Sequence, residues 1–134
     1  MILRSHAIGT LCLLTALSAC GGAQIDLNES DKANLDCLAA KTVMEIAAAV
    51  RTGLENGATA DSLSGIQADF TDTGAVRLAQ YYSDSGFEAY FRAETERRLV
   101  AMQNALANKA PGSADQSTLD ETMAMARTCS FGAI

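Results

Sequence analysis

Apolar and small side chains recur at spacings of three and four residues along most of the chain after residue 30, a pattern typical of helices with one buried face. The first such stretch begins near Asp31. Its repeating positions are Leu35, Leu38, Ala39, Thr42, Val43, Ile46, Val50 and Leu54. Asn28 or Ser30 can cap the start of this helix, and Gly53 or Gly57 can end it.

The most regular stripe lies between the Ser-Asp-Ser break at 83–85 and Pro111. Ser85 and Glu88 form a capping-box pattern, which predicts a helix start at Ser85. Pro111 cannot continue a helix, so the end is expected near Lys109. The stripe of this helix consists of Phe87, Phe91, Thr95, Leu99, Met102 and Leu106.

The region between these two helices has a weaker pattern. Leu63, Ile66 and Phe70 can share one face of a short helix over residues 58–72, although Gly65 weakens it. Thr73 can cap a separate segment that runs from about residue 74 to residue 82.

A last helix is predicted by the capping box of Ser113 and Gln116, and Leu119, Thr122, Met123, Ala126 and Cys129 then fall on one face. Valine and isoleucine are sparse after residue 30 and no alternating run persists, so strands are not expected. The chain is therefore predicted to be all-α, as a small bundle of four or five helices.

The first 19 residues have the features of a secretory signal peptide. Arg4 is followed by an apolar run from Ala7 to Leu17, which is shorter than the about 20 residues that cross a membrane. Leu17-Ser18-Ala19-Cys20 resembles the lipobox of bacterial lipoproteins. An ordinary signal peptide cut near Ala19 or Ala23 is the alternative; no family is recognised for residues 23–134.

The lipobox resemblance implies cleavage before Cys20 and acylation of the Cys20 thiol. Residues 1–19 would be removed, residues 20–30 would be the lipidated cysteine and a tether, and residues 31–134 would be the helical domain. Gly21 stands where members of this class retained in the inner membrane often have Asp, so the resemblance implies the periplasmic face of the outer membrane. The inner membrane or a soluble periplasmic location is the alternative.

The cysteine count changes with this processing. Cys12 is removed and Cys20 carries the lipid, which leaves Cys37 and Cys129 in the folded part. The periplasm is oxidising, so this pair predicts a disulfide that closes the bundle. Two free thiols are the alternative, but the pair has no C-x-x-C spacing.

Charge and residue types argue against several functions. Loss of residues 1–19 removes Arg4 and leaves nine basic against sixteen acidic residues, so nucleic acid is not an expected partner. His6, the single histidine, is removed as well, which argues against His-based triads and the usual zinc sites. No metal site and no cofactor other than the covalent lipid on Cys20 are predicted.

Two charged segments are candidate sites. The Asp69–Gly74 segment lacks the acidic ligands of a calcium loop and is interpreted as a turn that caps the next helix. The Glu88, Arg92 and Glu96 series and the Glu94–Arg98 pair are interpreted as ion pairs on a solvated helix face. An enzyme is therefore not expected.

Aromatic residues concentrate in the segment 70–91. They can form the core, or they can present a binding patch of Tyr81, Tyr82, Phe87 and Tyr90; the adjacent Tyr81 and Tyr82 cannot both point inward. The predicted function is a non-enzymatic, membrane-anchored periplasmic lipoprotein that acts through contacts with an envelope protein. The alternative is a periplasmic binding or chaperone-like module that holds apolar ligands or unfolded clients at segment 70–91.

Overall fold

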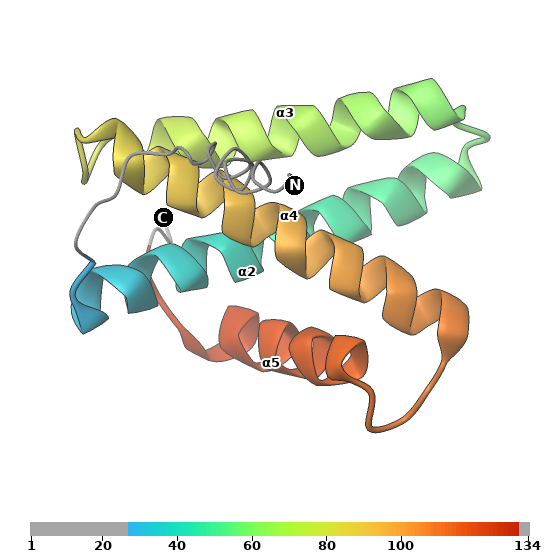
Figure 1. Ribbon diagram of the computed structural model, residues 1–134. Helices are drawn as coiled ribbons and strands as arrows, with labels where there is room; N and C mark the ends of the chain where they lie inside the picture. Colours follow the sequence, from blue (N-terminus) through green and yellow to red (C-terminus); the bar gives the residue numbers. More distant parts are fainter. Residues whose placement is uncertain (1–26, 132–134) are drawn as a thin grey trace, which may run out of the picture.

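The computed structural model describes residues 27–131, which fold into four helices (Figure 1). These are α2 (Glu29–Glu55), α3 (Ala60–Leu78), α4 (Ser85–Asn108) and α5 (Ala114–Thr128). No strand is present between residues 27 and 131, so the all-α prediction is confirmed with four helices. The signal peptide, the lipobox and most of the expected tether lie outside the described residues.

Two of the predicted helix starts are confirmed by their caps. The Asn28 side chain accepts a hydrogen bond from the Asp31 amide at 2.7 Å, and the Ser113 hydroxyl accepts one from the Gln116 amide at 3.1 Å. The first helix therefore begins inside the segment 20–30 that the sequence assigned to the tether. α4 ends at Asn108 and is followed by Lys109 in the left-handed conformation, close to the predicted end.

The start of α4 differs from the prediction by one residue. Asp84, not Ser85, is the cap, and its carboxylate accepts a hydrogen bond from the Gly86 amide at 2.7 Å. A carboxylate at this position satisfies an unpaired amide and also interacts favourably with the positive end of the helix dipole. Ser85 is instead the first residue of the helix.

The predicted break before Gly74 was wrong. Gly65 and Thr73 both lie inside the continuous helix α3, and Asp69 is likewise helical rather than part of a turn. Gly65 is tolerated because a glycine in an exposed helix costs only about 1 kcal/mol relative to alanine. Gly74 has a packing role: a Cβ there would lie 2.6 Å from the ring of Phe91, so its absence permits the close approach of α3 to α4.

The helices surround two clusters of apolar side chains. Figure 1 shows α3 above and α5 below the helices α2 and α4, which cross and then diverge toward the right. The first cluster lies toward the start of α2, and the second, smaller cluster lies farther along α2. The buried members of the first are Leu35, Leu38, Ala39, Ala75, Leu78 and Phe91, and those of the second are Val43, Ile46 and Leu99.

The Cys37–Cys129 disulfide is confirmed and joins α2 to the residue that follows α5. The two Cα atoms are 6.0 Å apart, and Cys37 is buried. The α5 helix has only 15 residues, and its buried side chains are Leu119 and Thr122. The disulfide therefore fixes one end of a short helix that contributes little to the core.

The Glu94–Arg98 pair was predicted to lie on a solvated helix face, and this prediction was wrong. Arg98 is 1% exposed, and its Nη1 donates a hydrogen bond to the Thr122 hydroxyl at 2.8 Å. Its Nε lies 2.9 Å from Glu94 Oε2 but is not aligned for a hydrogen bond. Position 98 faces α5, so a pairing rule based on one helix could not predict its burial. The Glu88–Arg92 pair, by contrast, is exposed as expected and also contacts Asp72.

Candidate functional site

Three of the four residues of the predicted aromatic patch lie at the edge of the first cluster. The Tyr82 ring stacks on Phe87 with 4.4 Å between ring centroids. The Tyr82 hydroxyl donates a hydrogen bond to Asp31 at 2.9 Å and accepts one from the Asn34 amide at 3.1 Å. These contacts occupy both the ring and the hydroxyl of Tyr82, which therefore has a role in holding the start of α2 to the turn between α3 and α4.

Tyr90 is also engaged within the fold. Its hydroxyl donates a hydrogen bond to Asp36 at 2.8 Å, and Asp36 accepts a second one from Lys32 at 2.8 Å. Partial burial, together with the Asp36 carboxylate, raises the pKa of Tyr90 to about 12. The hydroxyl thus stays protonated and serves as a structural donor.

Tyr81 is the member of the patch that faces solvent. Its side chain is 51% exposed, and its ring lies 4.8 Å from that of Phe131, between centroids. We call this part of the molecule, where α2 begins and α3 and α5 end, the tyrosine end. The structure brings Tyr82, Phe87 and Tyr90 into packed positions there and leaves one exposed ring.

The opposite end of the bundle contains an apolar groove, which we call the groove end. Its volume is about 330 Å³. The groove is lined by Ile46, Ala47, Val50, Arg51, Leu54, Gln67, Leu99, Met102, Gln103 and Leu106. Ile46 and Leu99 are buried, whereas Leu54 and Leu106 are 58% and 59% exposed. The groove therefore has a closed floor and an open mouth, and apolar side chains form most of its lining.

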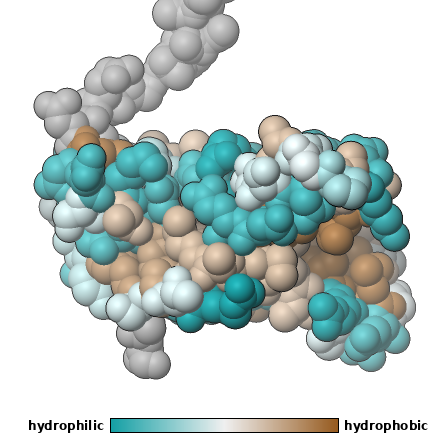
Figure 2. All heavy atoms as spheres, turned by 90° about the horizontal axis from the view of Figure 1, so that it is seen from below, coloured by the Kyte–Doolittle hydropathy of each residue, from teal (hydrophilic) through white to brown (hydrophobic). Residues whose placement is uncertain are grey.

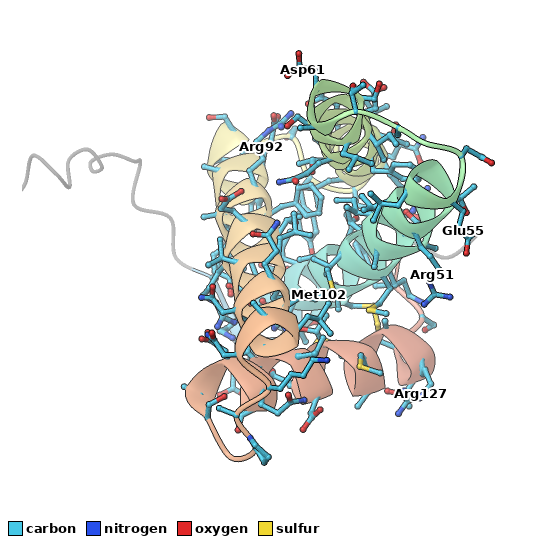
Figure 3. All side chains as sticks on the ribbon, turned by 90° about the vertical axis from the view of Figure 1, so that its right-hand side faces the viewer. Arg51, Glu55, Asp61, Arg92, Met102 and Arg127 are labelled. Atoms are coloured by element: carbon cyan, nitrogen blue, oxygen red, sulfur yellow. A yellow bond between two sulfur atoms is a disulfide. The ribbon has the colours of Figure 1, made fainter. Side chains whose placement is uncertain are left out.

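The figures agree with this placement. Figure 2 shows apolar side chains gathered in a recess at the right-hand end of the molecule, where Figure 1 places the end of α2 and the end of α4. Figure 3 looks at the same end and shows Met102 pointing from α4 into the space between the helices, whereas the Arg51 side chain extends from α2 away from α4.

The groove was not predicted from the sequence. The sequence correctly placed Val50, Leu54, Met102 and Leu106 on the apolar stripes of their helices, but it did not predict that they line a groove. The stripes extend beyond the point where α2 and α4 diverge, and the lining includes no residue of α5. The lengths of the helices could have indicated the groove. α5 has only 15 residues, whereas α2 and α4 have 27 and 24, so α5 is too short to cover the whole length of both stripes.

Two other features are less suited to binding an apolar group. A hollow of about 650 Å³ between α2 and α3 includes Glu45, Asp69 and Arg77, so charges of both signs line it. Residues 27–131 contain no group of three or more side chains that could hold a metal ion. None of the helices in that range is long and apolar enough to cross a membrane.

Comparisons of the chain with models of protein families, with curated proteins and with solved structures find no match. The function is therefore inferred from the residues of this chain and their arrangement.

Proposed function

We propose that this chain is a lipid-anchored protein of the cell envelope that acts by binding rather than by catalysis, and that the apolar groove is its binding surface. The resemblance of Leu17-Ser18-Ala19-Cys20 to a lipobox supports the anchor. Of the two functions considered from the sequence, the groove favours the binding of apolar ligands, at the groove end instead of segment 70–91.

The observation that carries this function is the pair of exposed leucines above a buried floor. Burying a leucine side chain is worth about 1.5–3 kcal/mol, so exposing Leu54 and Leu106 forgoes that stabilisation. Small-molecule sites are typically concave and mostly apolar with a few polar groups, as this groove is. A ligand that covers Leu54 and Leu106 would recover the free energy of burying these two side chains.

The proposed anchor would set the orientation of the groove relative to the membrane. The lipid on Cys20 would be joined through residues 21–28 to the start of α2, at the tyrosine end. α2 has 27 residues, which is about 40 Å of helix. The groove would therefore face away from the membrane, on the periplasmic side of the outer membrane.

The ionisable groups give little support to catalysis. Asp36 is held by Tyr90 and Lys32, and Glu94 is held by two arginines, so these carboxylates have structural partners. Removal of His6 with the signal peptide also removes the usual general base at neutral pH. Binding without covalent chemistry is the simpler role for the domain.

Binding in the groove can be tested with the neutral fluorophore N-phenyl-1-naphthylamine. We expect the wild-type protein to enhance its fluorescence saturably and Leu106→Gln to weaken the binding about tenfold. Val76→Gln is the matched control, because Val76 is 67% exposed on α3 and does not line the groove. Absence of binding to the wild type, or equal loss in both variants, would refute this site.

The anchor needs a separate test, because the groove can be functional in an unanchored protein. Cells expressing the chain are fed a palmitate analogue, and the wild type is compared with Cys20→Ser. We expect label in the wild type alone. An unlabelled wild type would refute lipidation, and sedimentation with inner-membrane vesicles would refute the outer-membrane location.

A second candidate function is contact with an envelope protein at the tyrosine end, which the exposed Tyr81 ring favours. A photo-reactive residue at position 81 is compared in cells with one at Gln103, on the groove. One discrete protein adduct at position 81 supports a dedicated partner there, a smear supports unfolded clients, and no adduct argues against this candidate.

A further inference from the structure

We propose that the groove binds a single-chain anionic amphiphile, such as a long-chain fatty acid, with its alkyl chain along the floor and its charged head at Arg51. This assignment rests on the groove being the binding surface proposed above, and it names the class of ligand.

The size of the groove favours one alkyl chain. Its volume is about 330 Å³, near the lower end of the roughly 300–1,000 Å³ typical of small-molecule sites. One turn of an α-helix with its side chains, taken as a cylinder about 10–12 Å wide and 5.4 Å long, occupies roughly 400–600 Å³. The groove is therefore too small to enclose a helix of a partner protein, whereas a flexible chain can lie within it.

The charge of the groove distinguishes it from the rest of the molecule. The chain has 16 acidic and 10 basic residues, yet no acidic side chain lines the groove. Arg51 is the one charged residue among its ten lining residues. A cationic head group would find no counter-charge there, and a neutral ligand would leave Arg51 unused.

Arg51 is available to an incoming anion. Within residues 27–131 it forms no ion pair or side-chain hydrogen bond, whereas Arg92, Arg97 and Arg98 are each paired with carboxylates. A guanidinium presents several N–H donors in a fixed plane that matches a carboxylate.

The gradient of exposure along the groove gives the ligand an orientation. Ile46 and Leu99 form the buried floor, and Leu54 lies at the mouth, three residues after Arg51 on α2. An alkyl chain would follow the apolar side chains inward while the head stays in solvent beside Arg51. Met102, which is flexible and polarizable, can adjust to the chain.

The test uses NMR of the purified protein labelled at its methionine methyl groups. Dodecanoate, dodecanol and dodecyltrimethylammonium are titrated below their micellar concentrations. We expect dodecanoate to shift the Met102 methyl signal saturably and to leave that of Met123, which lies on α5 outside the groove, unchanged. Dodecanoate should bind about fivefold more tightly than dodecyltrimethylammonium, as expected for one partly exposed ion pair.

Arg51→Gln is expected to abolish the preference for dodecanoate over dodecyltrimethylammonium. Arg127→Gln is the matched control, because Arg127 is exposed in the last turn of α5 and does not line the groove. Equal binding of the anionic and cationic probes would overturn the ligand class and leave the proposed function intact. Absence of Met102 shifts with all three probes would refute the function itself, and equal shifts at Met123 would indicate detergent-like adsorption and refute both.

Discussion

The helices α2, α3 and α4 contribute to both ends of the bundle, but one end is closed and the other is open. At the tyrosine end, Tyr82 and Phe87 stack, Phe131 lies against the rings, and the Cys37–Cys129 disulfide fixes the end of α5. At the groove end, α2 and α4 diverge and Leu54 and Leu106 remain exposed. The difference shows that similar apolar stripes form either a buried core or an exposed apolar groove, depending on whether another helix covers them.

Removing the disulfide should have the largest effect. In the chain-entropy model, a bond that spans 92 residues contributes about 4–5 kcal/mol to the free energy of unfolding. We expect a Cys37→Ser, Cys129→Ser variant to lose most of this amount in urea denaturation. Reduction of the wild type should have the same effect, and reduction of the variant should have none. A loss below about 1 kcal/mol would mean that the remaining contacts close this end without the bond.

Two glycines of α3 provide the next test, because only one of them lies against another helix. Gly74→Ala should lower the free energy of unfolding by about 1–3 kcal/mol, since the new Cβ would meet the Phe91 ring at 2.6 Å. Gly65→Ala should raise it by up to about 1 kcal/mol, since nothing lies within 4 Å of a Cβ there. Thermal or urea unfolding measures both. Equal effects of the two substitutions would contradict the close contact between α3 and α4.

The Tyr90–Asp36 hydrogen bond gives a smaller effect that depends on pH. Tyr90→Phe should cost about 1 kcal/mol at neutral pH, because Asp36 loses a donor. Folding raises the pKa of Tyr90 from about 10 to about 12, so its contribution is complete below pH about 10 and is lost as the pH rises toward 12.

Urea unfolding between pH 8 and 12 measures this dependence. The loss of stability with rising pH should be shallower in Tyr90→Phe than in the wild type. Tyr81→Phe, which alters an exposed ring at the same end, should follow the wild type. A Tyr90→Phe profile that matches the wild type would show that the raised pKa does not contribute to stability.

The smallest effect is expected at the groove end. Leu106→Gln should change the free energy of unfolding by no more than about 0.5 kcal/mol, because the side chain is 59% exposed. Urea unfolding at neutral pH measures this change. If the stability is unchanged, any loss of ligand binding in Leu106→Gln comes from the groove and not from unfolding. A loss above about 2 kcal/mol would mean that Leu106 belongs to the core.

The sequence predicted the features that depend on local pattern or on chemistry. The stripes of α2, α4 and α5, the caps at Asn28 and Ser113, and the pairing of Cys37 with Cys129 all followed from spacing, capping residues or cysteine count. The continuity of α3 was missed because glycine at position 74 serves contact with Phe91, which lies in another helix.

The candidate site also depends on contacts between helices, which the pattern within one helix does not specify. The burial of Arg98 depends on Thr122, which is 24 residues away, and the groove depends on the divergence of α2 and α4. Periodicity assigns a side chain to the apolar face of its own helix, but it does not specify whether another helix reaches that face. Leu54 and Leu106 could therefore be predicted as apolar positions and not as an opening.

The disulfide also has a mechanical consequence. A pulling force applied between residues 27 and 131 reaches Cys37, the ninth residue of α2, crosses the covalent bond to Cys129 and leaves at residue 131. Residues 38–128 lie outside this path and carry no tension. A force between these two ends would therefore act on the first turns of α2, whereas α3, α4 and the groove would carry no load.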